Sequence, residues 1–470
     1  MLYTPFSDCK TTAKQSSVAR ATASVVKRAQ LRRGNSSECK YVSINESWED
    51  TSVAGTSTSA DMSTSASCIK QSIHSGATNL SGRTLSPREA HEGSIVRSFV
   101  TKYGRRYLRD STMPYPLPSD ITEIHRQMLR TMLLCQVFDG PLCSPSFRSE
   151  PPASVLEIAC GSGFWSEMCH QHFSRKGHTS ISFTGIDVVK LGLHGEAPVK
   201  NDMNWRFIQH DLRQVPLPFP DEEFNFIMVK DLSMVTPITD MQQLLMDEYL
   251  RILKPGGTLE IWDSDHSLRM LLPPEESSTR GEEYKSAETQ QMPSHAPGTY
   301  IITQQTSLAA PRNKFILEYN AWIAKALEAR NLTCLPCTAI LPLLLQESEA
   351  LQDIESQRIA IPLGEIGWER DDRRPPAARE STASPAKGKA RVAESGDVDE
   401  TQVALRRTAL TTVVQMIESL EPILREASGK RPEEWDTWMG NIISYLLQKH
   451  DTLQDECLEV GAWWARKKEV

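Results

Sequence analysis

The clearest feature of the chain is a series of short apolar runs between residues 153 and 265. Runs of this length that are rich in Ile, Val, Phe and Trp predict strands. The predicted strands end at the following residues: Ile158, Ile186, Gln209, Val229 and Trp262. The four stretches between them have the length and mixed polarity of helices, and residues 241–253 place apolar side chains at helical spacing. Strands that alternate with helices predict parallel pairing, with helices on both faces of the sheet.

The predicted fold is therefore α/β, Rossmann-like and doubly wound, with a mostly parallel sheet. Polar segments interrupt it, because stretches without apolar periodicity cannot bury enough surface to fold. We expect a disordered Ser/Thr-rich tail over residues 1–95, a cap segment over 96–150, and the main domain over 151–470. Within that domain, residues 273–298 and 371–400 read as mobile insertions rich in Pro, Ser and charged residues.

Composition narrows the class of protein. The 470 residues are 39% hydrophobic, which is low for a packed chain, and carry a formal net charge of −8. An acidic chain without a concentrated basic surface gives no support for sequence-specific nucleic-acid binding, and no apolar run is long enough to span a membrane.

The first 40 residues nevertheless hold eight Lys or Arg. They fit a nuclear signal, an organelle transit peptide or a plain solvated tail, so we expect the cytoplasm or nucleus, with mitochondrial import as the alternative.

The cysteine and histidine pattern predicts no metal site. Cys334 and Cys337 form a single CxxC without a second pair, and two buried thiols near a helix start are the favoured interpretation. The group from Cys169 to His178 is a weak ligand candidate, since His170 and His172 would point apart on a helix.

A glycine turn follows the first strand. Gly161 and Gly163 come just after Glu157 and allow a sharp turn against which a ligand can lie on bare backbone. A dinucleotide fingerprint would continue with Gly or Ala where Ser166 stands. A tight turn without any ligand is the alternative interpretation.

Carboxylates recur at the strand ends, which a parallel sheet gathers at one rim. They are Glu157, Asp187, Asp211, Asp231 and Asp263. Asp187 stands where an acid accepts hydrogen bonds from ribose hydroxyls, although any of these aspartates also makes a good helix N-cap. Clustered acids repel phosphates, so a ligand with a ribose, an amino group and a cationic centre fits better. S-adenosylmethionine is such a molecule.

These motifs resemble those of the class I S-adenosylmethionine-dependent methyltransferases. The resemblance covers residues 153–265 in the family's order and spacing. Its parts are Val155 to Gly163, Gly185-Ile-Asp187, His210-Asp211 with Leu217-Pro-Phe, Phe224-Asn-Phe-Ile, and Leu253-Lys-Pro-Gly-Gly257. Ala159 departs from the pattern, because many members carry a glycine there.

A narrower resemblance precedes the domain. Tyr103-Gly-Arg-Arg-Tyr107, Tyr115 to Asp120, and then Glu123 and Arg126 are similar to the lead-in of fungal LaeA-like methyltransferases, which ends in a helix that covers the cofactor. Histidines that usually follow that helix appear here as Arg130 and Thr131. The resemblance implies an N-terminal helical cap and two further strands, at Ile359–Gly364 and, antiparallel, at Leu458–Arg466, which complete a seven-stranded sheet.

The resemblance also implies roles for single residues. Glu157, Gly161 and Gly163 would line the methionine and ribose portion of S-adenosyl-L-methionine, and Asp187 would hold the ribose hydroxyls. Asp211, helped by His210, would contact the adenine amine.

Two further residues, Lys230 and Asp231, would sit beside the methyl-transfer region. His266 is the candidate base, because histidine titrates near neutrality. We group Asp231 with it as a catalytic candidate; an exposed loop histidine is the alternative interpretation of His266.

The sequence thus predicts a methyltransferase acting on an O or N nucleophile of an unidentified small molecule or protein. The alternative is a regulatory protein that keeps the fold and works through protein partners, reached through the N-terminal tail, with little or no catalysis. A nicotinamide-dependent dehydrogenase fits poorly, because of Ser166 and the Lys254-Pro-Gly-Gly turn.

Overall fold

A computed structural model of the protein describes most of the chain after residue 98. The described ranges are 99–110, 112–113, 115–147, 150–191, 203–237, 240–273, 296–372, 400–448, 453 and 455–469. The predicted tail, residues 1–95, lies outside them, as do most of the two predicted insertions. The end of the first insertion belongs to the folded part, because Ala296 is buried and Arg406 donates a hydrogen bond to the Gly298 carbonyl at 2.8 Å.

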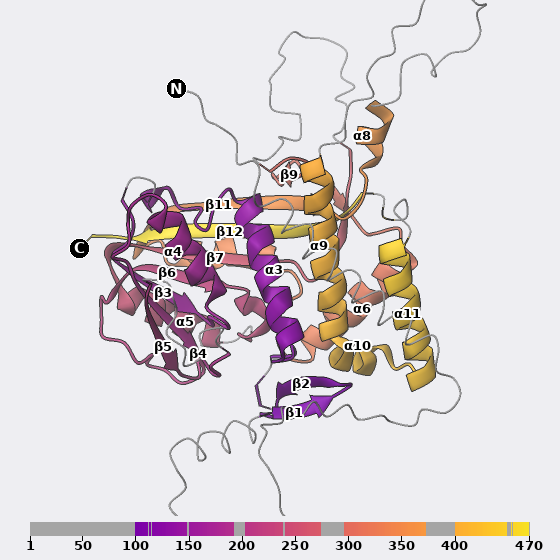
Figure 1. Cartoon of the computed structure of the whole chain (residues 1–470), viewed down its shortest axis with the longest axis horizontal. Coiled ribbons are helices and arrows are strands. Elements are labelled where there is room, and N and C mark those ends of the chain that lie inside the picture. The colour runs from indigo at the N-terminus through magenta and orange to yellow at the C-terminus, as the bar shows by residue number, and fades with distance from the viewer. Residues whose placement is uncertain are drawn as a thin grey trace, which may run out of the picture. The chain divides into compact units, whose positions relative to one another are not determined.

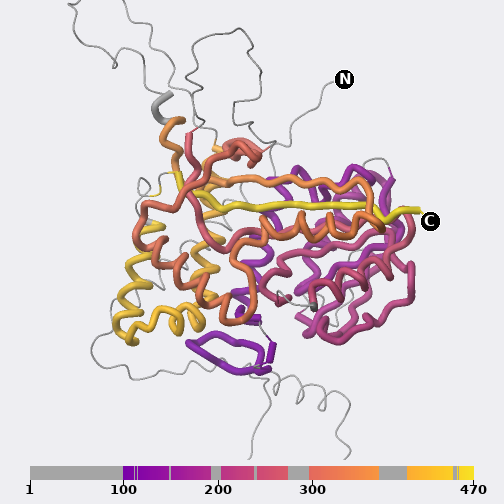
Figure 2. Tube along the Cα trace, turned by 180° about the vertical axis from the view of Figure 1, so that it is seen from behind, coloured from indigo at the N-terminus to yellow at the C-terminus, as the bar shows by residue number. Residues whose placement is uncertain are grey.

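Seven long strands form a mostly parallel sheet, which confirms the predicted fold. Side by side they are β5 (Asn204–Gln209), β4 (Ser182–Asp187), β3 (Ser154–Ile158), β6 (Phe224–Lys230), β7 (Leu253–Ser264), β12 (Glu456–Lys467) and β11 (Leu351–Pro362). The first five run parallel, and β12 lies antiparallel to both β7 and β11. In Figure 2 the yellow β12 runs beside the orange β11. Three short strands extend this end of the sheet: β8 (Arg269–Leu271), β9 (Tyr300–Ile301) and β10 (Leu308–Ala309).

Helices cover both faces of the sheet, because its central strands β3, β4 and β6 are buried on both sides. On β3, Leu156 and Ile158 enter one buried cluster with residues of the helices α5 and α7, while Val155 enters a second cluster with residues of the other long helices. The helices are α3 (Ile121–Val137), α4 (Phe164–Ser174), α5 (Asp240–Ile252), α6 (Lys314–Glu328), α7 (Pro336–Gln346), α8 (Gly367–Asp372), α9 (Glu400–Ser419), α10 (Glu421–Ser428) and α11 (Pro432–Gln448). Two short 3-10 helices are Pro145–Phe147 and Leu232–Met234. Burial on both faces is what a doubly wound sheet requires.

One predicted helix is wrong. The stretch between β5 and β6, residues 210–223, contains turns and no helix. Pro216, Pro218 and Pro220 alternate there, and each proline removes a backbone donor and clashes with the preceding helical turn. Mixed polarity over a helix-length stretch was therefore insufficient to predict a helix.

The cap consists of a hairpin as well as the predicted helix. Strands β1 (Phe99–Lys102) and β2 (Arg105–Leu108) pair across a two-residue turn in which Tyr103 and Gly104 have φ of 49° and 73°. Positive φ at both positions is the requirement of a type I′ hairpin turn. Gly104, which belongs to the lead-in motif of the predicted resemblance, thus forms the turn of this hairpin.

Helix α3 begins after Asp120, whose carboxylate accepts a hydrogen bond from the Glu123 N–H at 3.0 Å. Figure 1 shows α3 lying beside α9, and the two are joined by a hydrogen bond from the Ser419 hydroxyl to Glu123 at 2.8 Å. No helix in the described ranges combines the length and the apolar character needed to cross a membrane.

Candidate functional site

A cavity lies at the carboxyl ends of the parallel strands, between them and helix α3. Seven of the nine predicted site residues line it: Gly161, Asp187, His210, Asp211, Lys230, Asp231 and His266. The cap contributes Tyr115, Arg126, Gln127 and Arg130, and α9 contributes Met416. This rim is where sheets of this topology bind ligands.

The glycine turn forms one wall of the cavity. Asp187, at the end of β4, accepts a hydrogen bond from the Gly161 N–H through Oδ2 at 2.8 Å, and its Oδ1 accepts one from Val189 N–H at 3.3 Å. Burial raises the pKa of Asp187, while these backbone donors oppose that shift. A Cβ at Gly161 would lie 3.1 Å from the Gln127 side-chain oxygen, so α3 closes tightly over the turn.

Gly163 is required for packing rather than for contact with the cavity. Its φ is +73°, and a Cβ there would lie 2.9 Å from the Trp205 ring. Glu157 is likewise set back from the wall. It is buried, and it accepts hydrogen bonds from the Ser166 hydroxyl at 2.7 Å and the Ser166 N–H at 3.3 Å. Burial raises the pKa of Glu157 to about 7. Both residues therefore fix the shape of the turn from behind.

His210 and Asp211 follow the end of β5 and also line the cavity. Arg213 binds the Asp211 carboxylate at 2.7 Å and also reaches Asp110 of the cap segment at 2.7 Å. This arginine holds the pKa of Asp211 below its usual range. The ring of His210 contacts the Gln214 carbonyl through Nε2 at 2.7 Å.

Asp231 is the centre of an ion-pair group on the floor of the cavity. It has a left-handed φ of 57°. Arg130 donates to its Oδ1 at 2.5 Å, and Lys230 donates to Oδ2 at 3.1 Å. These two cations hold the pKa of Asp231 far below its usual range although the residue is partly buried, so the carboxylate is ionised and both of its oxygens are bound.

His266 is buried, which rules out the exposed loop histidine that we considered. Its Nε2 lies 2.9 Å from the Ser233 hydroxyl, and Ser233 donates to Asp263 at 2.8 Å. Burial, together with the positive charge of Arg130, lowers the pKa of His266 to about 3, so the imidazole is neutral. Burial raises the pKa of Asp263 to about 7, helped by the Asp231 carboxylate.

Sequence reasoning missed three residues of this site. Arg130 was noted only as a departure from the LaeA-like pattern, Ser233 was not considered, and Gln127 carries no motif. A signal for Arg130 existed, because Arg126 and Arg130 are four residues apart and so share a face of α3. The contact between Arg130 and Asp231 joins positions 101 residues apart, which no local pattern reveals.

The apolar wall of the cavity is rich in methionine. Met113, Met234, Met241 and Met416 line it, together with Leu245. Methionine is flexible and polarisable, and it adapts to irregular apolar partners.

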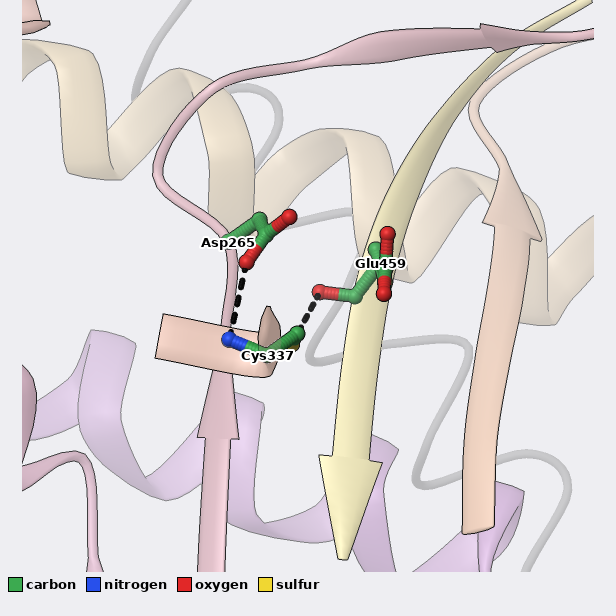
Figure 3. Close-up of side chains that lie close together, drawn as sticks. All are labelled: Asp265, Cys337 and Glu459. Atoms are coloured by element: carbon green, nitrogen blue, oxygen red, sulfur yellow. Dashed lines mark hydrogen bonds between the residues drawn. The ribbon is translucent and has the colours of Figure 1, made fainter. Parts of the chain in front are cut away.

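A second group of buried ionisable residues lies outside this cavity. Figure 3 shows Asp265, Cys337 and Glu459 facing one another, with the Cys337 N–H donating to Asp265 at 3.0 Å. Arg269 binds both carboxylates, and Arg358 binds Glu459 as well. Two guanidinium groups balance the two carboxylates, and burial raises the pKa of the Cys337 thiol well above its usual value. The group therefore stabilises the junction of α7 with β12, and its charge leaves no surplus to attract a metal ion.

Known proteins match the central part of the chain. A family model described as a methyltransferase domain matches residues 155–257. A demethylmenaquinone methyltransferase of Listeria monocytogenes is 30% identical over 121 residues, which are 25% of this chain and 47% of that protein. One from Tropheryma whipplei is 27% identical over 122 residues, covering 25% of this chain and 45% of its own length. The chain thus spans about half the length of the relatives it matches.

Two solved structures are similar to this chain, both at low sequence identity and low TM-score. The YcgJ protein of Bacillus subtilis is 14% identical, with a TM-score of 0.31, and the match covers 74% of this chain and all of that one (100%). Phosphoethanolamine N-methyltransferase 2 of Haemonchus contortus, solved with S-adenosyl-L-methionine, is 14% identical, with a TM-score of 0.30, over 73% of this chain and 57% of that one.

The family match covers the segment that contains the glycine turn and the acids of β3, β4, β6 and the end of β5. The matched segment also contains the five parallel strands up to the first part of β7. Residues 155–257 of this chain therefore match a methyltransferase domain.

Proposed function

We propose that the protein transfers a methyl group from S-adenosyl-L-methionine to an oxygen or nitrogen of an acceptor bound in the cavity. The observation that carries this proposal is the position of Asp187. Its carboxylate ends β4 on the cavity wall and holds the Gly161 N–H at 2.8 Å, within the segment that matches the methyltransferase domain.

The residues present fit the cofactor. A carboxylate has about four acceptor positions, and Asp187 uses one on each oxygen for backbone N–H groups, which leaves positions for two ribose hydroxyls. Asp211 and His210, further along the same rim, are the candidates for the adenine amine. Glu157 and Gly163 contribute through the turn that they fix, and Lys230 through its bond to Asp231.

When bound, the cofactor supplies a methyl group that its sulfonium already makes electrophilic. The protein then has to align the acceptor and exclude water, and alignment of this kind contributes roughly 7–11 kcal/mol to catalysis. The cap supports both tasks, since Tyr115, Gln127 and Arg130 close the cavity from above.

His266 is the candidate that contacts the acceptor. When Asp263 is ionised, it takes the single O–H of Ser233, so Ser233 accepts from Nε2–H of His266, and Nδ1 keeps its lone pair. A neutral imidazole with a pKa near 3 orients an O–H or N–H by accepting its hydrogen bond, and it takes the proton only as methyl transfer makes that group acidic. Asp231, with both oxygens bound, positions Arg130 and Lys230 beside the reaction.

For the methyl acceptor we propose a chemical class only. The methionine-lined wall beneath the cap supports a small molecule with an apolar body, and a protein side chain is the alternative.

The finer resemblance to LaeA-like methyltransferases is part of the same proposal. It is supported by α3, which carries Glu123 and Arg126 over the cavity, as a covering helix would. The regulatory alternative depends on partners of the basic tail, residues 1–95, which lie outside the described residues. A cytoplasmic or nuclear location, with mitochondrial import as the alternative, stays a prediction from the same residues. Deleting residues 1–95 and comparing captured proteins and location with the full chain tests these points.

Methyl transfer tests the proposed function. The full chain is incubated with methyl-labelled S-adenosylmethionine and extract of the cells that make it, and labelled products are identified by mass spectrometry. We expect a labelled product that Asp187→Asn reduces by about 100-fold, because two charge-assisted hydrogen bonds of about 1.5–3 kcal/mol each are weakened. Asp247→Asn, an exposed aspartate of α5, is the matched control and should behave as the wild type. Equal labelling by the wild type and Asp187→Asn would contradict the proposal.

A further inference from the structure

Arg126 presents a buried donor without a partner at the cavity. The side chain is 3% exposed, and its Nε and Nη2 donate to Glu123, at 2.9 Å and 2.6 Å at the closest. Its third nitrogen, Nη1, is buried and has no hydrogen-bond partner among the residues that the structure describes. Leaving a charged donor buried and unpaired costs free energy, so such a group indicates a missing acceptor.

A second helix of the same chain shows what a completed pair looks like. Arg251 on α5 binds Glu248 three residues earlier, through Nε at 2.9 Å and Nη2 at 2.7 Å, as Arg126 binds Glu123. The Nη1 of Arg251 is satisfied by Asp221 at 2.7 Å and by the Phe219 carbonyl. Arg251 lies away from the cavity, whereas Arg126 lines it. Arg126 lines this cavity and also a smaller one beside α9, and only the larger cavity is also lined by Gly161 and Asp187, so we look for the missing acceptor there.

The charge around Arg126 favours an anion. The connected ion pairs of this wall contain three cations, Arg126, Arg130 and Lys230, but only two carboxylates, Glu123 and Asp231. Glu123 is already occupied by Arg126, Gln127 and Ser419, and Asp231 by Arg130 and Lys230. One positive charge is left over at a wall that has little contact with water.

The position of Arg126 indicates which anionic group would bind it. Gln127, the next residue on α3, lies over Gly161, and Gly161 is bound on its other side by Asp187, the proposed ribose ligand. On the proposed adenine side of the rim, all three nitrogens of Arg213 are already bound, by Asp211, Thr112 and Asp110, so this cation has its acceptors. An anionic group of the cofactor therefore belongs on the cap side of the glycine turn, where Arg126 lies.

We infer that Nη1 of Arg126 donates a hydrogen bond to the α-carboxylate of the methionine part of the bound cofactor. This inference rests on the proposed function. It makes Arg126 a cofactor-binding residue, and it couples cofactor binding to the docking of the cap, because Glu123 joins Arg126 to Ser419 of α9.

The test compares two ligands that differ only in the carboxylate. S-adenosylhomocysteine and its decarboxylated analogue, S-adenosyl-3-thiopropylamine, are titrated calorimetrically into the full chain, into Arg126→Gln and into the matched control Arg251→Gln. We expect Arg126→Gln to weaken S-adenosylhomocysteine binding by about 10- to 100-fold, the range for a hydrogen bond between charged groups. The decarboxylated analogue should bind the wild type and Arg126→Gln with the same affinity. Arg251→Gln should change neither.

The outcomes separate this inference from the proposed function. If the wild type binds neither ligand, the proposed function itself is wrong. If the wild type binds S-adenosylhomocysteine but Arg126→Gln weakens both ligands equally, Arg126 acts only on the cap's structure and the inference is overturned. Unchanged affinity of Arg126→Gln for S-adenosylhomocysteine overturns it as well. The analogue also reports folding, since it binds a correctly folded variant.

Discussion

Substitution of Gly163 tests why the turn after β3 needs a glycine at this position. In the structure, the Trp205 ring occupies the space that a side chain at Gly163 would need. A Cβ at Gly163 would lie 2.9 Å from Cζ2 and 3.1 Å from Cη2 of that ring, and the residue has a φ of +73°. Gly163→Ala therefore incurs two costs. The left-handed backbone costs about 1–2 kcal/mol for alanine, and the overpacking against a ring costs about 1–3 kcal/mol more.

Gly104 is a matched control, since it has the same φ of +73° and nothing lies within 4 Å of its would-be Cβ. We expect Gly104→Ala to lower the free energy of unfolding by about 1 kcal/mol, from the backbone alone, and Gly163→Ala to lower it by about 2–5 kcal/mol. Equilibrium urea unfolding measures both.

A double-mutant cycle with Trp205→Ala separates the two costs. Once the ring is removed, Gly163→Ala should cost about as much as Gly104→Ala, which gives a coupling energy of about 1–3 kcal/mol. If Gly163→Ala costs the same with and without Trp205, the ring does not explain the glycine, and the packing role is refuted.

Three further predictions concern the same rim. Ala159 has a φ of +50°, so Ala159→Gly should raise the free energy of unfolding by about 0.5–1 kcal/mol, after the entropy cost of glycine is subtracted; a loss of stability in urea would contradict this. Arg130→Met should destabilise the protein by about 2–4 kcal/mol, less than a fully buried broken pair because Asp231 is 29% exposed and keeps Lys230. Adding Asp231→Asn, which removes the charge and tolerates the left-handed φ of 57°, should recover part of the loss. The third prediction concerns pH. The pKa of Glu157 is raised to about 7 in the folded protein, from 4.5, so the folded state holds a proton that the unfolded state has lost, and stability falls as pH rises through that window. Between pH 4.5 and 7, the slope of the free energy of unfolding against pH should be reduced in Glu157→Gln by the equivalent of up to one bound proton. An unchanged slope in pH-dependent unfolding would contradict the claim that burial raises the pKa of Glu157.

The sequence predicted what depends on local patterns. Strand ends were predicted within two residues, as Ile186 against the observed Asp187 and Trp262 against Ser264 show, because apolar runs of four to six residues are bounded by polar rim residues. The antiparallel final pair also followed from the family resemblance, and β11 and β12 confirm it.

What escaped prediction depends on contacts between distant residues. The hairpin around Gly104 needs a partner strand, and four residues of β1 carry too weak an alternation to predict one. Trp205 reaches Gly163 only because β5 and β3 lie on either side of β4. The Arg130–Asp231 pair and the unpaired Nη1 of Arg126 arise from how α3 docks on the sheet, and docking of a helix is set by tertiary packing.

The central claim is that this rim binds S-adenosylmethionine through Asp187, and calorimetric titration of S-adenosylhomocysteine into the full chain tests it most directly. We predict one binding site in the wild type and in Asp247→Asn, with affinity lowered about 100-fold in Asp187→Asn, because hydrogen bonds from two ribose hydroxyls lose their charged acceptor. Absence of binding to the wild type, or equal affinity in Asp187→Asn, would contradict the claim.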